Sequence, residues 1–116
     1  MLAHNYRFHG HGSLKFVFKN GDTLRSKHLV LRISTNPRRE QVRAAVVVSK
    51  KIYKAAVKRN RIRRRIYEVM RPLVAELPEA YDVAFIVVRP DVLVAPYADL
   101  EIEVKDLLML GVSQLK

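Results

Sequence analysis

The chain has 116 residues, a formal charge of +11, 49% apolar residues and no cysteine. This length and apolar share fit one globular domain with a hydrophobic core and exclude a fully disordered basic tail. The lack of cysteine excludes disulfides and thiolate metal sites, and the N-terminus resembles neither a signal peptide nor a membrane span. We therefore expect a cytoplasmic protein.

The first residues carry little pattern. Residues 1–12 contain glycine, histidine and asparagine without an apolar periodicity, so we expect a flexible N-terminal arm followed by one domain at 13–116. His9 and His11 alternate in this arm without a third ligand nearby. We therefore expect no metal site there.

A short helix is predicted at 14–20, between a Ser13 N-cap and Gly21. Its i, i+3, i+4 stripe is Leu14, Val17 and Phe18. Val17 fits a core position best. Phe16 and Phe18 are candidates for stacking on RNA bases, because single-stranded RNA is commonly held on aromatic side chains.

Strand patterns follow. Residues 28–34 alternate, with Leu29, Leu31 and Ile33 on one face and Arg32 on the other, and a shorter strand is expected before them at 22–27. After a polar loop at 35–41, the Val and Ala run at 42–48 is typical of a strand buried on both faces.

The segment from Lys50 to Arg71 concentrates the charge: ten Lys or Arg residues against one acidic residue give +9 of the formal +11. At about 100° per residue, a helix here has an apolar arc and a basic arc. The apolar arc is Ala55, Ile62, Ile66, Val69 and Leu73, with Met70 at its edge. The basic arc is Lys54, Lys58, Arg61, Arg64, Arg65 and Arg71, with Val57 among the charges and Arg59 and Arg63 along the rim. Pro72 is expected to end or kink the helix.

This charge pattern indicates a nucleic acid partner. Like charges repel in the free protein, and a polyanion converts that cost into affinity by releasing its counterions. Arginine chelates phosphate oxygens, and the Asn60 amide can read a base edge or a 2′-hydroxyl. A solvated helix face normally mixes both signs, so we favour nucleic acid binding over that interpretation.

Two further elements are predicted after the basic helix. Residues 81–89 read as a central strand that Pro90 stops. A helix is expected from Pro96 to Gly111, buried through Leu100, Val104, Leu107 and Leu108. The basic helix lies between two strands in the sequence. This order predicts that the two strands are buried, parallel neighbours in the sheet.

Catalytic motifs are absent from the sequence. It has no Gly-rich phosphate loop and no Ser/His/Asp, Cys/His or HExxH arrangement. The acidic residues Glu76, Glu79, Asp82 and Asp99 show no spacing that indicates a Mg²⁺ site. We predict no catalytic residue and no metal site in this chain.

The chain resembles the bacterial ribonuclease P protein subunit over roughly Arg7 to Leu110. The specific part of the match is Arg43 through Val48, then Ser49-Lys50-Lys51-Ile52, Ala56-Val57 and Lys58-Arg59-Asn60-Arg61-Ile62-Arg63-Arg64. Val17-Phe18 with Gly21 is similar to the family's N-terminal helix and turn. Tyr81-Asp82-Val83 through Arg89-Pro90 is similar to its later strand.

The resemblance implies an α+β sandwich whose four-stranded sheet has αβββαβα order. It also implies a left-handed βαβ crossover through the basic helix, against the usual right-handed rule. The implied function is that of a noncatalytic protein component of an endoribonuclease ribonucleoprotein. A catalytic RNA, using Mg²⁺ that it holds with the substrate, removes the 5′ leader of precursor tRNA. The implied partners are this RNA and the leader, with no membrane and no small-molecule substrate.

Site residues follow from the resemblance in two groups. The RNA-binding group is Lys50, Lys51, Lys54, Lys58, Arg59, Asn60, Arg61, Arg63 and Arg64. The leader cleft is expected to contain Leu14, Phe16, Phe18 and Arg32.

Four residues depart from the family pattern. Leu14 replaces an aromatic residue and removes one stacking contact, for which Phe16 can compensate. Ala44 and Tyr53 stand where glycine is frequent. Tyr67 replaces a frequent arginine and leaves a ring that can stack.

Two alternatives stay open on the sequence. A ribosomal-type or general RNA-binding protein would show no preference for leader-bearing precursors. A protein-only nuclease would cleave without an RNA partner, and the lack of clustered carboxylates argues against it.

Overall fold

The computed structural model describes residues 22–35, 42–77 and 81–115. The described elements, in chain order, are β1 (Asp22–Arg25), β2 (Leu29–Thr35), β3 (Arg43–Val47), α2 (Ala56–Ala75), β4 (Tyr81–Val87), the 3₁₀ helix η2 (Pro90–Leu93) and α3 (Tyr97–Leu115). The predicted arm at 1–12 and the predicted helix at 14–20 lie outside the described residues.

The four strands form one mixed sheet in the order β1-β2-β4-β3. β1 and β4 each pair antiparallel with β2, whereas β3 and β4 are parallel. The predicted parallel neighbours around the basic helix and the central place of β4 are thus confirmed. The prediction that β3 is buried on both faces is wrong, because β3 is an edge strand whose Ala45 and Val47 are only partly buried.

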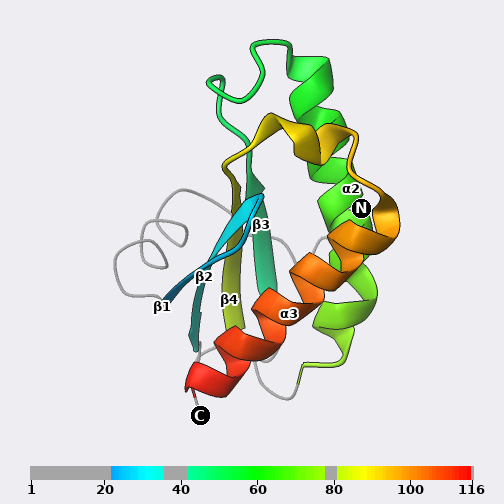
Figure 1. Ribbon diagram of the computed structural model, residues 1–116. Helices are drawn as coiled ribbons and strands as arrows, with labels where there is room; N and C mark the ends of the chain where they lie inside the picture. The colour runs from blue at the N-terminus through cyan, green and yellow to red at the C-terminus, as the bar shows by residue number, and fades with distance from the viewer. Residues whose placement is uncertain (1–21, 36–41, 78–80, 116) are drawn as a thin grey trace.

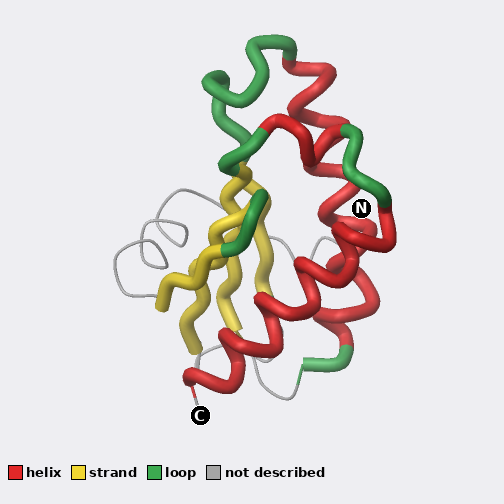
Figure 2. Tube along the Cα trace, in the orientation of Figure 1, coloured by secondary structure: helices red, strands yellow, loops and turns green. Residues whose placement is uncertain are grey.

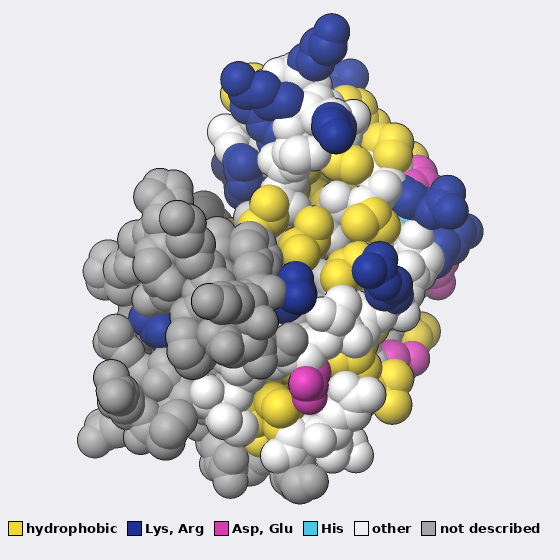
Figure 3. All heavy atoms as spheres, turned by 90° about the vertical axis from the view of Figure 1, so that its left-hand side faces the viewer, with side chains coloured by type: hydrophobic (Ala, Val, Ile, Leu, Met, Phe, Trp, Pro, Cys, Tyr) yellow, Lys and Arg dark blue, Asp and Glu magenta, His cyan; other side chains and the backbone are white. Residues whose placement is uncertain are grey.

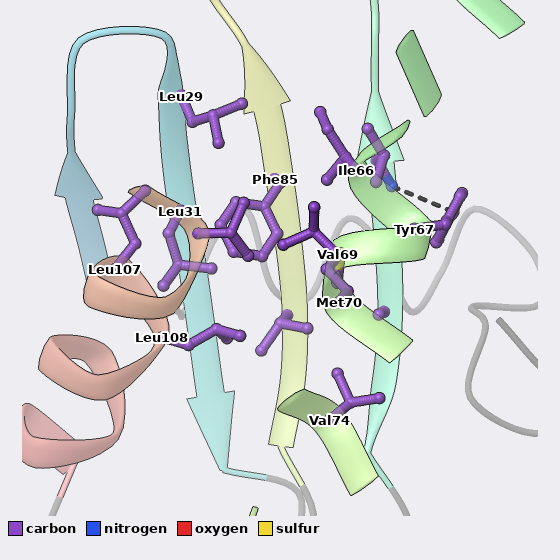
Figure 4. Packing of buried hydrophobic residues seen from close by; sticks show 14 of the residues in the cluster. Leu29, Leu31, Ile66, Tyr67, Val69, Met70, Val74, Phe85, Leu107 and Leu108 are labelled. Carbon is purple, nitrogen blue, oxygen red and sulfur yellow. Dashed lines mark hydrogen bonds between the residues drawn. The ribbon is translucent and has the colours of Figure 1, made fainter. Parts of the chain in front are cut away.

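Both helices cover the same face of the sheet (Figures 1 and 2). α3 packs on β1 and β2, and α2 packs on β3 and on α3. The predicted alternation of β2 is confirmed, because Leu29, Leu31 and Ile33 lie in the core while Arg32 does not. Figure 4 shows Phe85 of β4 between the side chains from α3 and those from α2.

The basic helix begins and ends later than predicted. α2 starts at Ala56, so Lys54 and Ala55 precede it, and Ala55, predicted on the apolar arc, is exposed. α2 continues through Pro72 to Ala75, so of the two expected effects of Pro72, an end or a kink, the end is wrong. Val74, which is 3% exposed, and the partly buried Leu73 hold the last turn against the core, and this packing outweighs the missing proline N–H. The predicted buried positions Ile62, Ile66 and Val69 are confirmed.

The last helix also runs beyond its predicted end. Gly111 lies inside α3, which continues to Leu115. A Cβ at Gly111 would lie 3.0 Å from Cγ2 of Ile33 and 3.2 Å from Cδ2 of Leu31. Glycine here therefore lets α3 approach β2 closely, and it does not end the helix.

Candidate nucleic-acid interface

The cations of the basic segment come from two adjacent elements at one end of the molecule. β3 leads into a turn in which the Ser49 carbonyl accepts the Ile52 amide N–H at 3.1 Å. The segment 49–55 then leads into α2. The exposed cations here, which we call the basic end, are Lys50, Lys51, Lys54, Lys58, Arg61 and Arg64. Figure 3 shows Lys and Arg side chains gathered at the top of the molecule, where this segment lies in Figure 1.

The start of α2 is unusual for a helix. Its N-cap, Ala55, makes no side-chain capping hydrogen bond, and the first turn contains no acidic residue. The positive end of the helix dipole instead lies beside further positive charge, which is unfavourable in the free protein and favourable next to an anion. Val57 is 69% exposed among these cations, as the helical pattern predicts.

Arg59 organises the entry into the helix. Its Nη1 donates to the backbone carbonyl of Tyr53 at 2.9 Å and to that of Lys54 at 2.7 Å. The Lys58 ammonium lies 5.1 Å from the centre of the Tyr53 ring, within the range of a cation–π contact. These contacts join the segment 49–55 to the first turns of α2.

Arg63 and Asn60 are paired on the next turn. Nη1 of Arg63 donates to Oδ1 of Asn60 at 2.6 Å. This bond uses the amide oxygen, so the Asn60 amide presents its NH₂ group as a donor. Arg59 and Arg63 are half-buried, as expected for positions at the rim of the apolar arc.

Arg65 was predicted to lie on the outward basic arc, and this prediction is wrong. Its Nη1 donates to the carbonyls of Val92 at 2.6 Å and Leu93 at 2.8 Å, and its Nη2 donates to the carbonyl of Ala95. The guanidinium thus binds the end of η2 and the connection to α3. A helical wheel does not reveal this role, because the carbonyls come from a segment about thirty residues further along the chain.

Tyr67 does not offer a ring for stacking, contrary to expectation. It is 7% exposed, and its hydroxyl accepts the Val46 N–H of β3 at 3.2 Å (Figure 4). The residue that replaces a frequent arginine of the resembled family therefore belongs to the core.

Arg32 lies on the sheet face opposite the helices and is half-buried. It is level with Thr23 of β1 and Ala84 of β4, in adjacent strands. Arg43, on the same face, is committed to Asp82, with Nε–Oδ1 and Nη2–Oδ2 distances of 3.0 and 2.8 Å. The other predicted leader residues, Leu14, Phe16 and Phe18, lie outside the described residues.

A second polar cluster, which sequence patterns did not reveal, holds the β1–β2 turn against α3. Nδ1 of His28 lies 2.7 Å from Oε1 of Glu103, and the His28 amide donates to Oε2 at 2.9 Å. Nε2 of His28 lies 3.2 Å from Asp91. Burial would raise the pKa of the Glu103 carboxyl, but hydrogen bonds from Ser26 and His28 outweigh burial, so this pKa is below its usual value.

Residues 22–35, 42–77 and 81–115 contain no group of three or more His, Cys, Asp or Glu side chains placed to hold a metal ion. Among the same residues, no helix is both long and apolar enough to cross a bilayer.

Known proteins match both the sequence and the fold. The family model for ribonuclease P matches residues 2–110. The ribonuclease P protein component of Chloroflexus aurantiacus is 35% identical over 103 residues, covering 89% of this chain and 75% of that protein. The Cyanothece component is 34% identical over 125 residues, covering 93% of each chain.

Solved structures share the fold at lower identity. The Staphylococcus aureus RNase P protein has a TM-score of 0.77 at 23% identity, covering 90% of this chain and 94% of that one. The Thermotoga maritima RNase P protein has a TM-score of 0.69 at 21% identity, covering 86% and 89%.

The family match spans nearly the whole chain, and the curated relatives align over most of their own length. The chain therefore belongs to the ribonuclease P protein family and is a protein component of the ribonucleoprotein enzyme that matures the 5′ end of tRNA with a catalytic RNA.

Proposed function

We propose that the basic end docks on the catalytic RNA of ribonuclease P. The observation that carries this proposal is the gathering of six exposed cations, from the segment 49–55 and α2, at one end of the molecule. Each phosphate that they neutralise releases condensed counterions, and this release supplies salt-dependent affinity. The rim residues Arg59 and Arg63 and the NH₂ group of Asn60 complete this surface.

The 5′ leader of precursor tRNA is the second proposed ligand. Arg32 supplies a cation on the sheet face away from α2 and α3, separate from the core. In this proposal Leu14, Phe16 and Phe18 complete the cleft with apolar and aromatic contacts to single-stranded RNA.

We also propose that α2 crosses from β3 to β4 in the left-handed sense, because the resemblance to the ribonuclease P protein family implies this crossover.

We propose that the catalytic RNA carries out the chemistry at the scissile phosphate. The described residues offer no cluster of carboxylates for a divalent cation, and Asp82 is committed to Arg43. We therefore propose that the catalytic RNA and the substrate hold the Mg²⁺. The protein would act by neutralising phosphates where the two RNAs approach each other, in the cytoplasm and without a small-molecule substrate.

A processing assay tests this proposal. Precursor tRNA is incubated at low Mg²⁺ with the cognate catalytic RNA, with the protein, or with both. We expect 5′ cleavage only in the mixture. No stimulation by folded protein would instead favour a general RNA-binding role, and cleavage by the protein alone would contradict the assignment of catalysis to the RNA.

A further inference from the structure

Tyr53 connects three segments that are separate in the sequence. Its ring lies below the Lys58 ammonium of α2, at 5.1 Å from the ring centre. Its carbonyl accepts a hydrogen bond from Arg59 at 2.9 Å. Its hydroxyl donates to the carbonyl of Pro90, at the start of η2, at 3.3 Å.

The segment that Tyr53 holds has few other attachments. Between Ser49 and Ala55, the backbone bonds in the described part of the chain are the turn from Ile52 N to the Ser49 carbonyl and the first helical bonds to Ala55. Ala55 contributes no side-chain cap. Ile52 and Tyr53 are the partly buried members of this segment, whereas Lys50, Lys51 and Lys54 are exposed.

Rigid attachment matters for a surface built from lysines. Each lysine side chain and each loop residue that binds RNA loses conformational freedom, and this loss subtracts from affinity. A segment that already has its RNA-bound arrangement in the free protein loses less conformational freedom on binding. The Tyr53 side chain positions the Lys58 ammonium through its ring and ties the segment to Pro90 through its hydroxyl. Arg59 holds the backbone carbonyls of Tyr53 and Lys54 beside these contacts.

We propose that Tyr53 is a positioning residue for RNA binding. It joins the segment 49–55, the first turn of α2 and the start of η2 into one preformed cationic surface, without itself contacting a phosphate. This inference rests on the proposed docking of the basic end on RNA and adds a residue that the predicted RNA-binding set does not contain.

The test compares Tyr53→Ala with Lys58→Ala in binding to the catalytic RNA over a range of salt concentrations. Tyr53→Ala is expected to weaken binding roughly three- to ten-fold, because the segment must become ordered on binding. Its log–log salt slope should equal that of the wild type, since the number of neutralised phosphates is unchanged. Lys58→Ala should instead lower the slope by roughly one unit.

Two more variants separate the ring from the hydroxyl and guard against a folding defect. Tyr53→Phe keeps the ring beneath Lys58 but loses the bond to Pro90, so its affinity should lie between those of the wild type and Tyr53→Ala. Tyr53→Leu keeps apolar bulk but loses the aromatic face, and it should bind like Tyr53→Ala. Amide hydrogen exchange of the free variants should accelerate at 50–55 and stay unchanged in β2 and β4 for both Ala and Leu.

The outcomes are distinct. Equal affinity of the wild type and Tyr53→Ala would overturn the positioning role, and so would a Tyr53→Ala slope reduced like that of Lys58→Ala. Failure of the wild-type protein to bind the RNA would overturn the proposed docking itself. Weaker binding at an unchanged slope, with faster exchange at 50–55, would support the inference.

Discussion

Arg64 and Arg65 are neighbours with the same charge, but their side chains have different surroundings on α2. Arg64 is exposed on the basic end. Arg65 donates to three backbone carbonyls at 92, 93 and 95. Hydrogen bonds that involve a charged group contribute more to stability than neutral ones. The pair therefore provides a matched comparison between a cation proposed to bind RNA and a structural one.

Replacing Arg65 is expected to affect stability. Arg65→Ala should lower the free energy of unfolding by about 2 kcal/mol, because the carbonyls of η2 lose a charged donor. Its salt slope in RNA binding should match that of the wild type. Arg64→Ala should show the reverse: little change in urea unfolding and a lower slope. A stable Arg65→Ala protein with a reduced slope would contradict the structural role.

The Glu103 carboxyl is expected to contribute a pH-dependent stability. Its pKa is lowered in the folded state, so the stabilisation is present at neutral pH and is lost as the pH falls through the folded-state value. Glu103→Gln keeps the shape without the charge. The stability difference between the wild type and this variant should shrink below about pH 5. Urea unfolding at a series of pH values measures it, and a difference that stays constant down to acid pH would refute this account.

At the scale of helices and strands, local sequence patterns correctly predicted which residues pack in the hydrophobic core. The alternation of Leu29, Leu31 and Ile33 predicted which face of β2 is buried, and the helical spacing of Ile62 and Ile66 did so for α2. Hydrophobic periodicity reports burial directly, and these positions follow it.

Local patterns failed where a distant segment decides the outcome. Pro72 and Gly111 are ordinary helix-ending signals, yet packing on the core carries both helices past them. Arg65 and Tyr67 were assigned to the surface because the carbonyls and the strand edge that they bind come from other elements. The candidate site was predictable as a charged segment, but the bracing by Tyr53 was not.

Gly111→Ala distinguishes helix propensity from close packing. Propensity alone would stabilise α3 by about 1 kcal/mol. The new methyl group would lie 3.0 Å from Cγ2 of Ile33, a β-branched side chain with little freedom to move. We expect a net loss of about 1 kcal/mol from overpacking, measured by urea unfolding. Ser113→Ala, at an exposed position of the same helix, is the control and should not destabilise. A stabilised Gly111→Ala protein would show that α3 can shift on β2.

At the scale of the whole molecule, charge is unevenly distributed. The segment from Lys50 to Arg71 carries +9 of the formal +11, and α3 has acidic residues at 99, 101, 103 and 106 against Lys105. The field of the protein is therefore directional, with the basic end attracting RNA from a distance. This polarity favours one orientation of docking before any contact forms.

Self-repulsion at the basic end should make the free protein more stable in salt. Raising KCl from about 0.05 M to about 0.5 M should raise the thermal midpoint by roughly 4 °C, because screening weakens repulsion among the cations. A variant with Lys50, Lys51, Arg61 and Arg64 all changed to Gln should respond less. An equal rise of the thermal midpoint in both proteins would show that the repulsion does not arise from these four cations.

The bond between Tyr67 and the Val46 N–H has a consequence for solubility. β3 is an edge strand, and an exposed edge is a template on which another chain can add a strand and start aggregation. The Tyr67 hydroxyl occupies one donor of this edge, and the other edge strand, β1, is only four residues long and carries Arg25. Tyr67→Phe would leave the proposed RNA-binding cations intact but uncover that donor. A concentrated stock of the purified variant should therefore form insoluble aggregates sooner than the wild type on storage.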